Sequence, residues 1–514
     1  MINNDPSLKP VYMTSEPNVS ISLYEGDIRL EQSGRVSTIH ASILLTWLPQ
    51  TCIRFEPHDQ ISGYIGRAKL TIASLSLNCD VLISKESCRC IIRGQLVGRP
   101  AAIKTTTCDN ALFHLPNFES KHRLHLNNDE WDVILSPIDN ISDLTNCLDE
   151  QGGFGLTHVG RLKRIDGGQF DKDQALDKLD SLYYFLSFVR GLWCGPILPI
   201  GLTDDIVGWQ VWDTPRLTPW KYVSSWFFTS EPQGINEAFN GYMEKWVDPF
   251  WNEPTKLAIH WYIEANIGSG GVEGSIVLIQ AALEMLSWIY LIEAPDASKP
   301  CTINDFEEKW PASKKIETLL KSMGIPLTIP DQFTELQKAL VELQKIDSNA
   351  KKFPFGSYIF TYIRNRITHA AEVNRAKLDS ISFEARVEAK ELGLWYVEMV
   401  LLRLFGFNGV YYMRFSRGSP ADQIMRVPWD LEIEKILLEK AHYENGSLRE
   451  KPILKSDLIR DAVEEGIKEW KVREVLRYLE IKGYISSVEG EVPDTGKYSL
   501  SKEGKSYLAK LANL

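Results

Sequence analysis

The sequence predicts a multidomain α+β protein with an N-terminal antiparallel β-rich module, a central all-α helical bundle and a C-terminal winged helix-turn-helix-like domain. Short alternating segments bounded by Gly, Pro, Asn and Asp fill the first third of the chain. Apolar residues with a helical period dominate the middle, and three helical segments precede two short strands at the end. A length of 514 residues suggests about three or four domains. We place them at residues 1–170, 171–253, 254–410 and 428–514.

The composition is that of a globular protein, with 44% hydrophobic and 24% charged residues. There are 57 basic and 68 acidic residues, which excludes a general nucleic-acid binder of the basic type. The first five residues lack the features of a signal peptide, so we expect a cytoplasmic protein. The longest apolar run, 276–292, contains Gln280 and Glu284. A carboxylate is costly in lipid, so we expect a buried bundle helix and no membrane partner.

The cysteines indicate reduced thiols rather than a metal or disulfide framework. The eight stand at positions 52, 79, 88, 90, 108, 147, 194 and 301, and no pair has CxxC spacing. His122 and His125 are near each other, but no Cys or carboxylate pair stands at typical partner spacing. We therefore expect no metal and no cofactor.

Residues 1–170 predict an antiparallel sandwich or barrel-like module made of short strands. The segment contains no catalytic constellation. It is either a recognition or sensor surface or a plain scaffold. The candidate strands are 20–24, 39–48, 68–72, 81–84, 89–93, 123–126 and 131–135.

Residues 171–253 form an aromatic-rich connecting region that begins with a helix. Asp171 and Gln174 have capping-box spacing, and Gly191 can end this helix after Arg190. The tryptophans that follow, interleaved with cations, either stack nucleic-acid bases or fill a core or seam. They are Trp193, Trp209, Trp212, Trp220, Trp226, Trp246, Trp251 and Trp261.

From residue 254 the periodicity predicts a bundle of roughly five or six helices. The Gly-rich stretch 268–271 resembles a phosphate loop only superficially, because no Gly-Lys-Ser/Thr follows, and a helix-helix turn is the expectation. Glu284 lies at the centre of the longest apolar helix and needs a partner. The expected helices are 256–266, 272–292, 305–323, 332–346, 356–372 and 383–405.

The stretch 359–370 is the candidate site. Read as a helix, one face is apolar, and the opposite face carries Arg364, Asn365, Thr368 and His369. His can move protons near neutral pH, Arg fits phosphate oxygens, and Asn can orient the imidazole or a ribose hydroxyl. These groups suit RNA cleavage without metal, with Glu284 and Thr368 as supporting candidates. The alternative is an ordinary solvated face.

This segment resembles the HEPN superfamily, most closely its ApeA-like branch, over residues 254–410. The resemblance is carried by Ala282-Leu283-Glu284 in an apolar helix, the 315–320 segment, Ile325-Pro326, the 363–369 segment and a long closing helix. It assigns the family's Arg, polar residue and His to Arg364, Asn365 and His369 as catalytic residues. It also implies a metal-independent ribonuclease whose site forms between two bundles of a homodimer or higher homo-oligomer. A role in bacterial defence against phage, as in abortive infection, with a phage-derived or protein trigger, is implied as well.

Residues 428–514 resemble a winged helix, with helices at 431–440, 454–465 and 469–482 and strands on either side of a loop at 489–495. The 418–420 region and Pro428 mark a linker before it. DNA binding and protein docking both remain open, because the region from residue 430 has 15 basic and 17 acidic residues. The candidate DNA contacts are Lys468, Lys471, Arg473 and Arg477.

We therefore expect an endoribonuclease that acts by attack of the ribose 2′-hydroxyl and leaves a 2′,3′-cyclic phosphate. The alternative is a non-catalytic regulator that binds DNA or protein through the winged helix.

Overall fold

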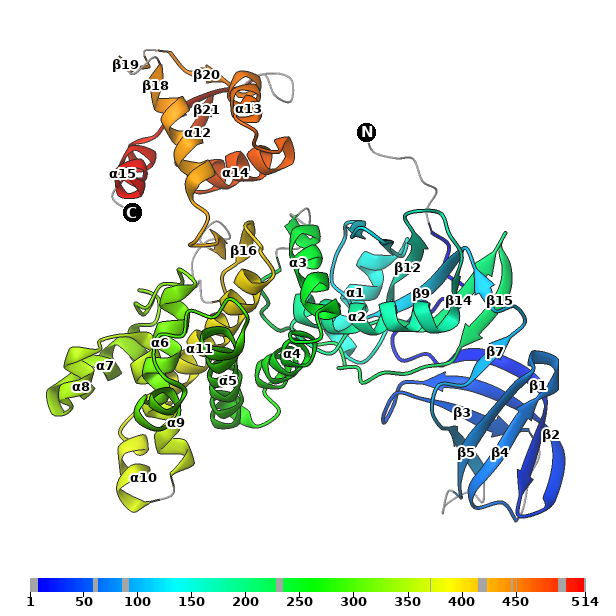
Figure 1. The fold of residues 1–514 in the computed structure, drawn as a ribbon. Helices are drawn as coiled ribbons and strands as arrows, with labels where there is room; N and C mark the ends of the chain where they lie inside the picture. Colours follow the sequence, from blue (N-terminus) through cyan, green and yellow to red (C-terminus); the bar gives the residue numbers. More distant parts are fainter. Residues whose placement is uncertain are drawn as a thin grey trace. The chain divides into compact units, whose positions relative to one another are not determined.

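The computed structural model describes residues 8–58, 63–85, 92–227, 234–369, 371–414, 423–444, 447–449, 451–488 and 496–512. The chain divides into two units, Met1–Val223 and Ser224–Leu514 (Figure 1). The first unit is β-rich and antiparallel, and the second is largely helical. The mixed α+β class predicted from the sequence is therefore confirmed. The cysteines among the described residues are free, and Cys88 and Cys90 lie outside those residues.

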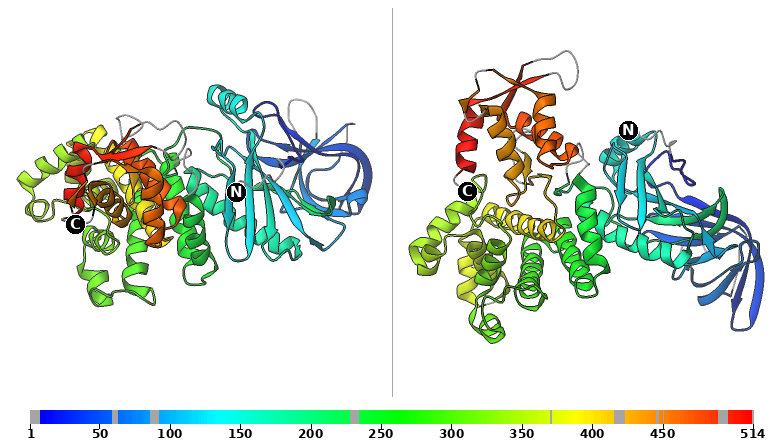
Figure 2. Two further views of the ribbon diagram at one scale, coloured as in Figure 1. Left: turned by 90° about the horizontal axis from the view of Figure 1, so that it is seen from above. Right: turned by 45° about the horizontal axis from the view of Figure 1, so that its top comes forward.

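A closed antiparallel barrel forms the first part of the first unit, with strand order β1-β2-β3-β6-β5-β4 (Figure 2). Alternate side chains such as Ile28, Leu30 and Ile43 point into a fully buried interior. The predicted strands at 68–72 and 81–84 lie within it, and those at 20–24 and 39–48 overlap β1 and β2, which begin at Ile21 and end at Thr46. Of the predicted strand at 89–93, residues 92 and 93 belong to β6, and residues 89–91 lie outside the described part. The strands are β1 (Ile21–Gln32), β2 (Arg35–Thr46), β3 (Cys52–Pro57), β4 (Gly66–Ile72), β5 (Leu77–Lys85) and β6 (Ile92–Leu96).

A seven-stranded antiparallel sheet follows in the same unit, with order β10-β11-β12-β9-β14-β15-β7. Two of its strands come after residue 170, so this sheet joins the β-rich segment to the connecting region. The predicted strands at 123–126 and 131–135 are confirmed. The strands are β7 (Ala101–Ile103), β9 (Asn110–Pro116), β10 (Leu124–Asn127), β11 (Trp131–Pro137), β12 (Leu156–Arg164), β14 (Ile197–Thr203) and β15 (Ile206–Val211), and β8 (Thr107–Cys108) pairs separately with β13 (Phe170–Asp171).

Two helices accompany this sheet. The expectation of strands alone before residue 170 is wrong at α1 (Ile141–Gln151), where Leu144 and Leu148 are spaced four apart and buried. Helix α2 (Lys172–Arg190) confirms the predicted capping box. The Asp171 carboxylate accepts the Gln174 N–H at 2.8 Å, the Gln174 side chain accepts the Asp171 N–H at 2.9 Å, and Gly191 ends the helix at φ 75°.

Most of the tryptophans between residues 193 and 261 belong to protein cores. Six of them are at most 8% exposed, so their faces are enclosed by protein and unavailable to bases. For these six the base-stacking alternative is wrong and the core-filling alternative is confirmed. They are Trp193, Trp209, Trp212, Trp226, Trp246 and Trp251.

The second unit begins with a helical assembly in which α11 packs against α4, α5, α7 and α9 (Figure 1). Helix α5 with its π-helical extension, residues 271–293, is long and apolar enough to cross a membrane, but 61% of its apolar window is buried inside this fold. The helices are α3 (Ile235–Val247), α4 (Asn252–Ile267), α5 (Gly271–Trp288), α6 (Ala312–Ser322), α7 (Thr334–Ile346), α8 (Ser348–Lys352), α9 (Gly356–Thr368), α10 (Glu372–Asp379) and α11 (Phe383–Leu404), with π-helical turns at Ile289–Glu293 and Asp305–Lys309.

Two predicted helices of this region are divided in the structure. The 305–323 helix breaks at Trp310, whose extended backbone precedes Pro311 at the start of α6. The 356–372 helix ends at Thr368, and α10 begins at Glu372. Both predictions of a continuous helix are wrong at these points. The helical spacing of apolar residues continues across each short non-helical segment, so the spacing alone does not reveal the interruption.

The C-terminal part of this unit has its own apolar core, which includes Leu437, Leu458 and Leu476. The three predicted helices are confirmed, whereas the 418–420 linker and the 489–495 loop lie outside the described residues. The elements are β16 (Val410–Tyr412), β17 (Ile424–Arg426), α12 (Glu432–His442), β18 (Tyr443–Glu444), β19 (Ser447–Leu448), β20 (Ile453–Leu454), α13 (Lys455–Glu464), α14 (Glu469–Ile481), β21 (Ile485–Val488), β22 (Lys497–Leu500) and α15 (Lys502–Leu511).

Candidate functional site on helix α9

Helix α9 is held in the bundle by its apolar face. Ile359, Phe360 and Ile363 are at most 1% exposed, and the helix packs against α5, α6 and α11. Gly393 of α11 permits the close approach, because a Cβ there would lie 2.6 Å from Cε2 of Phe360 and 2.7 Å from Cγ2 of Ile279. The opposite face of α9 is therefore presented at a defined position.

The C-terminal end of α9 places His369 just outside the helix. His369 is the C-cap residue, with φ −97° and ψ 106°, and its N–H donates to the Asn365 carbonyl oxygen at 3.1 Å. Its side chain is exposed. The Thr368 hydroxyl donates to the Arg364 carbonyl oxygen at 3.1 Å, which supports the last turn of the helix. Ala370 lies outside the described residues.

Arg364 and Asn365 are brought together by a direct side-chain contact. Nη1 of Arg364 donates to Oδ1 of Asn365 at 3.2 Å, while Nη2 lies 3.9 Å from Oε1 of Glu284. The side chains of Arg364 and Glu284 are 28% and 33% exposed, and Nε of Arg364 is buried with no hydrogen-bond partner. The guanidinium is therefore oriented by the protein but retains donor capacity.

A polar network on α5 fixes Glu284. The amide of Gln280, which is fully buried, donates to Oε1 of Glu284 at 2.8 Å and accepts from the Thr361 hydroxyl at 3.4 Å. These contacts join α5 to α9 through the interior of the bundle. The sequence predicted that Glu284 needs a partner. The structure supplies both Arg364 and Gln280, and Gln280 was noted in the sequence only as a break in an apolar run.

A pocket of about 470 Å³ borders this site on the other side of α9. Asn365 and Arg366 line it, together with residues from the start of α6 and from α8. The Tyr358 hydroxyl donates to Asp347 at 2.8 Å at its edge, and burial raises the pKa of that phenol. Asn365 therefore lies between the Arg364 cation and a cavity, a position that the spacing of residues in the sequence did not reveal.

These groups can act on a phosphodiester. A partly exposed guanidinium can hold a non-bridging phosphate oxygen, and an exposed imidazole can accept or donate a proton. Asn365 positions the guanidinium through the hydrogen bond between their side chains. The structure thus places Arg364, Asn365 and Glu284 in contact and leaves His369 one helical turn beyond Asn365.

The four candidate DNA contacts near α14 are not equivalent. The Lys471 ammonium lies 3.3 Å from Glu237 and 3.5 Å from Asp430, and its side chain is 13% exposed. Arg473 pairs with Glu469 at 2.8 Å, while Lys468 and Arg477 are exposed. Lys471 therefore stabilises the contact between α14 and α3, which the sequence could not reveal because Glu237 is so distant along the chain.

Two parts of the chain match known families. Residues 103–223 match the family model of the YopA central domain, and residues 248–424, which include α9, match that of the YopA C-terminal domain. The chain is 28% identical over 315 residues to the SPbeta prophage-derived uncharacterized protein YopA of Bacillus subtilis (strain 168). The match covers 61% of this chain and 67% of that protein. No solved structure matches the chain. The sequence is thus similar to YopA in the seven-stranded sheet region and in the helical bundle.

Proposed function

We propose that this protein is a metal-independent endoribonuclease of the HEPN type, with its active centre at the end of α9. The observation that supports the proposal is the loose pairing of Arg364. The cation is oriented by Asn365 and Glu284, yet its side chain remains 28% exposed. By contrast, the side chains of Arg414 and Arg426 are each 1% exposed and lie against fully buried carboxylates.

In the proposed reaction, the His369 imidazole takes the proton of a ribose 2′-hydroxyl. The 2′-oxygen then attacks the adjacent phosphorus, and the bond from phosphorus to the 5′-oxygen breaks. Arg364 stabilises the negative charge that develops on the phosphoryl oxygens. The leaving 5′-oxygen takes a proton from an imidazolium, so the products are a 2′,3′-cyclic phosphate and a 5′-hydroxyl.

The active form in this proposal is a homodimer or a higher homo-oligomer. A twofold axis near the ends of two α9 helices would bring two copies of Arg364 and His369 to one RNA strand. The exposure of His369 supports this arrangement, because an exposed imidazole can reach both a substrate and a second copy of the chain. Sedimentation velocity with and without RNA measures the assembly state.

The test is cleavage of total RNA by the purified full-length chain in the presence of EDTA. His369→Ala and Arg364→Ala should each lower the rate by about 10² or more, the usual effect of removing a general base or a charge-stabilising group. His125→Ala is the matched control, since His125 is an exposed histidine paired with Asp132 in the first unit. Equal cleavage by all four proteins, or loss of cleavage in EDTA alone, would refute the proposal.

The biological setting we propose is conflict with phage, in which the protein acts as a defence factor or toxin-like ribonuclease. A prophage-derived relative supports a place in phage biology. A phage-derived or protein trigger would act by changing the assembly of the bundle. Expression of the wild type and of His369→Ala during phage infection tests this setting, and equal phage yields in both strains would contradict it.

We also propose a winged-helix arrangement for residues 428–514, with α13 and α14 as its helix pair and β21 and β22 as its wing. The three-stranded order β20-β22-β21 and the packing of α13 on α14 support it. Docking of protein is favoured over reading of DNA, because Lys471 and Arg473 are already paired with carboxylates. Binding of the full chain to a duplex with a steep salt dependence, lost in Arg477→Ala, would instead establish DNA binding.

A further inference from the structure

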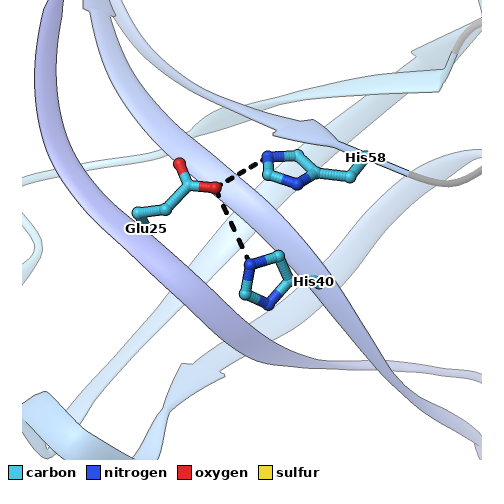
Figure 3. Close-up of side chains that lie close together, drawn as sticks. All are labelled: Glu25, His40 and His58. Carbon is cyan, nitrogen blue, oxygen red and sulfur yellow. Dashed lines mark ion pairs between the residues drawn. The ribbon is translucent and has the colours of Figure 1, made fainter.

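Three neighbouring strands of the barrel bring one carboxylate and two imidazoles together on its outer face. Oε1 of Glu25 lies 2.8 Å from Nε2 of His58 and 3.7 Å from Nε2 of His40. The three potential ligand atoms lie within 4.8 Å of one another, and all three residues are exposed. Figure 3 shows both imidazoles directed at the same carboxylate oxygen. Among the described residues, this is the one such group of three potential metal ligands.

The pairing of the strands explains the cluster. In the β1–β2 register Glu25 stands opposite Ser42 and Asp27 opposite His40, and the His58 N–H donates to the His40 carbonyl oxygen at 3.0 Å. Residues two apart on a strand share a face, so β1 contributes Glu25 and Asp27 to the face that carries both histidines. The ligands come from β1, β2 and the end of β3.

A second set of contacts orients the potential ligands. Nδ1 of His40 lies 2.9 Å from Oδ1 of Asp27, an acceptor that fixes the Nδ1–H tautomer and leaves the Nε2 lone pair directed toward Glu25. The Ser42 hydroxyl donates to Oε2 of Glu25 at 2.5 Å, which leaves Oε1 facing the imidazoles. Carboxylate–histidine–metal arrangements of this kind are typical of zinc sites.

We propose that Glu25, His40 and His58 form a site for a divalent transition metal of the Zn²⁺ class. Two imidazole nitrogens and one carboxylate oxygen suit zinc, whereas Ca²⁺ and Mg²⁺ prefer oxygen ligands alone. Binding would replace the contact between Nε2 of His58 and Oε1 of Glu25 by bonds from both atoms to the metal. Three protein ligands leave a fourth position, and the exposure of the cluster opens that position to water or to a further ligand.

The site is independent of the proposed ribonuclease centre. It lies in residues 25–58, outside both segments that match YopA domains. Its bound metal would cross-link three strands and thereby stabilise the barrel against unfolding. Loss of metal binding therefore leaves the ribonuclease proposal intact, and loss of RNA cleavage leaves the metal site intact.

The test is the zinc content of the full chain after removal of metal with EDTA, reloading with ZnCl₂ and desalting. The wild type should hold one equivalent more than His40→Ala and His58→Ala. Asp27→Asn should bind about 10- to 100-fold more weakly, the usual effect of losing a carboxylate behind a ligating histidine. Titration calorimetry with ZnCl₂ should show one binding event in the wild type that is missing in His40→Ala and His58→Ala.

His125→Ala is again the matched control, because it removes an exposed His–carboxylate pair that has a single imidazole. It should bind as the wild type does. Cobalt loading separates this site from adventitious binding to cysteines, since a site without sulfur gives no thiolate charge-transfer band. The circular dichroism melts of the metal-free variants check that each variant is folded. Equal zinc content in the wild type and in both folded histidine variants would overturn the proposal.

Discussion

Two buried histidines in the seven-stranded sheet should make the first unit sensitive to acid. His114 of β9 and His158 of β12 are fully buried. Nε2 of His114 accepts the Tyr12 N–H at 3.0 Å, so protonation would break that bond. Nε2 of His158 donates to the Ser120 carbonyl oxygen at 3.0 Å. Burial lowers the pKa of His114 to about 4 and that of His158 to about 3, because neither imidazolium would be solvated.

The sign and size of the effect follow from these pKa values. An imidazole has a pKa near 6.5 in the unfolded chain. Below that pH the two histidines therefore bind protons in the unfolded state but stay neutral in the folded state. The free energy of unfolding should be unaffected by these two groups above about pH 7 and should fall below pH 6.5. Each histidine contributes up to about 1.4 kcal/mol per pH unit, so the two together remove roughly 3 kcal/mol between pH 6.5 and 5. That loss is a large share of a typical total stability of about 5–15 kcal/mol.

Urea titrations across this pH range, read by hydrogen exchange of peptides from β9 and β12, measure the effect in this unit alone. The comparison is with His114→Gln/His158→Gln, in which amide groups can replace the hydrogen bonds without titrating. The wild type should lose about 3 kcal/mol more than the double variant over the same interval. Parallel pH profiles of the two proteins would refute the reasoning, because the acid loss would then come from other groups.

Three further predictions concern stability. Gly393→Ala should destabilise the bundle by about 1–3 kcal/mol, because its Cβ would overlap Phe360 of α9. Gly274→Ala in α5 should stabilise the bundle by about 0.5–1 kcal/mol, because no atom lies within 4 Å of the added Cβ. Chemical denaturation measures both, and a neutral Gly393→Ala would contradict the close packing of α9 on α11. Asp171→Ala removes the capping box of α2 and should lower the free energy of unfolding by about 1 kcal/mol. Asp173→Ala is the control in the same helical turn, and an equal loss of stability in both variants would contradict the role of the cap.

The elements predicted well from the sequence are those set by neighbours along the chain. The capping box at Asp171 and the polar face with Arg364 and Asn365 depend on spacings of one to four residues, which the helical period translates directly into proximity. The helix break at Trp310 and the helix α1 were not predicted. The spacing of apolar residues over a short stretch does not show where a helix is interrupted or where a short helix lies between strands.

Sites assembled from distant strands could not be predicted in the same way. Glu25, His40 and His58 are separated by 15 and 18 residues, and they meet only because of the registers of β1–β2 and β2–β3. A shift of one residue in either register would move a ligand to the inner face of the barrel. The pairing of Lys471 with Glu237 is hidden for a related reason, because it depends on how α14 packs near α3.

Comparison of three arginines in the second unit indicates what kind of group Arg364 is. Arg414 and Arg426 are each 1% exposed, and they contact the fully buried carboxylates of Glu398 and Glu434 at 2.6 Å and 2.7 Å. Such pairs are structural, because removing either partner leaves an uncompensated buried charge. Arg364 is 28% exposed and lies 3.9 Å from Glu284, a separation longer than any direct hydrogen bond. The proposed function requires a cation that solvent and a ligand can reach, and of these three arginines Arg364 is the one with a partly exposed side chain.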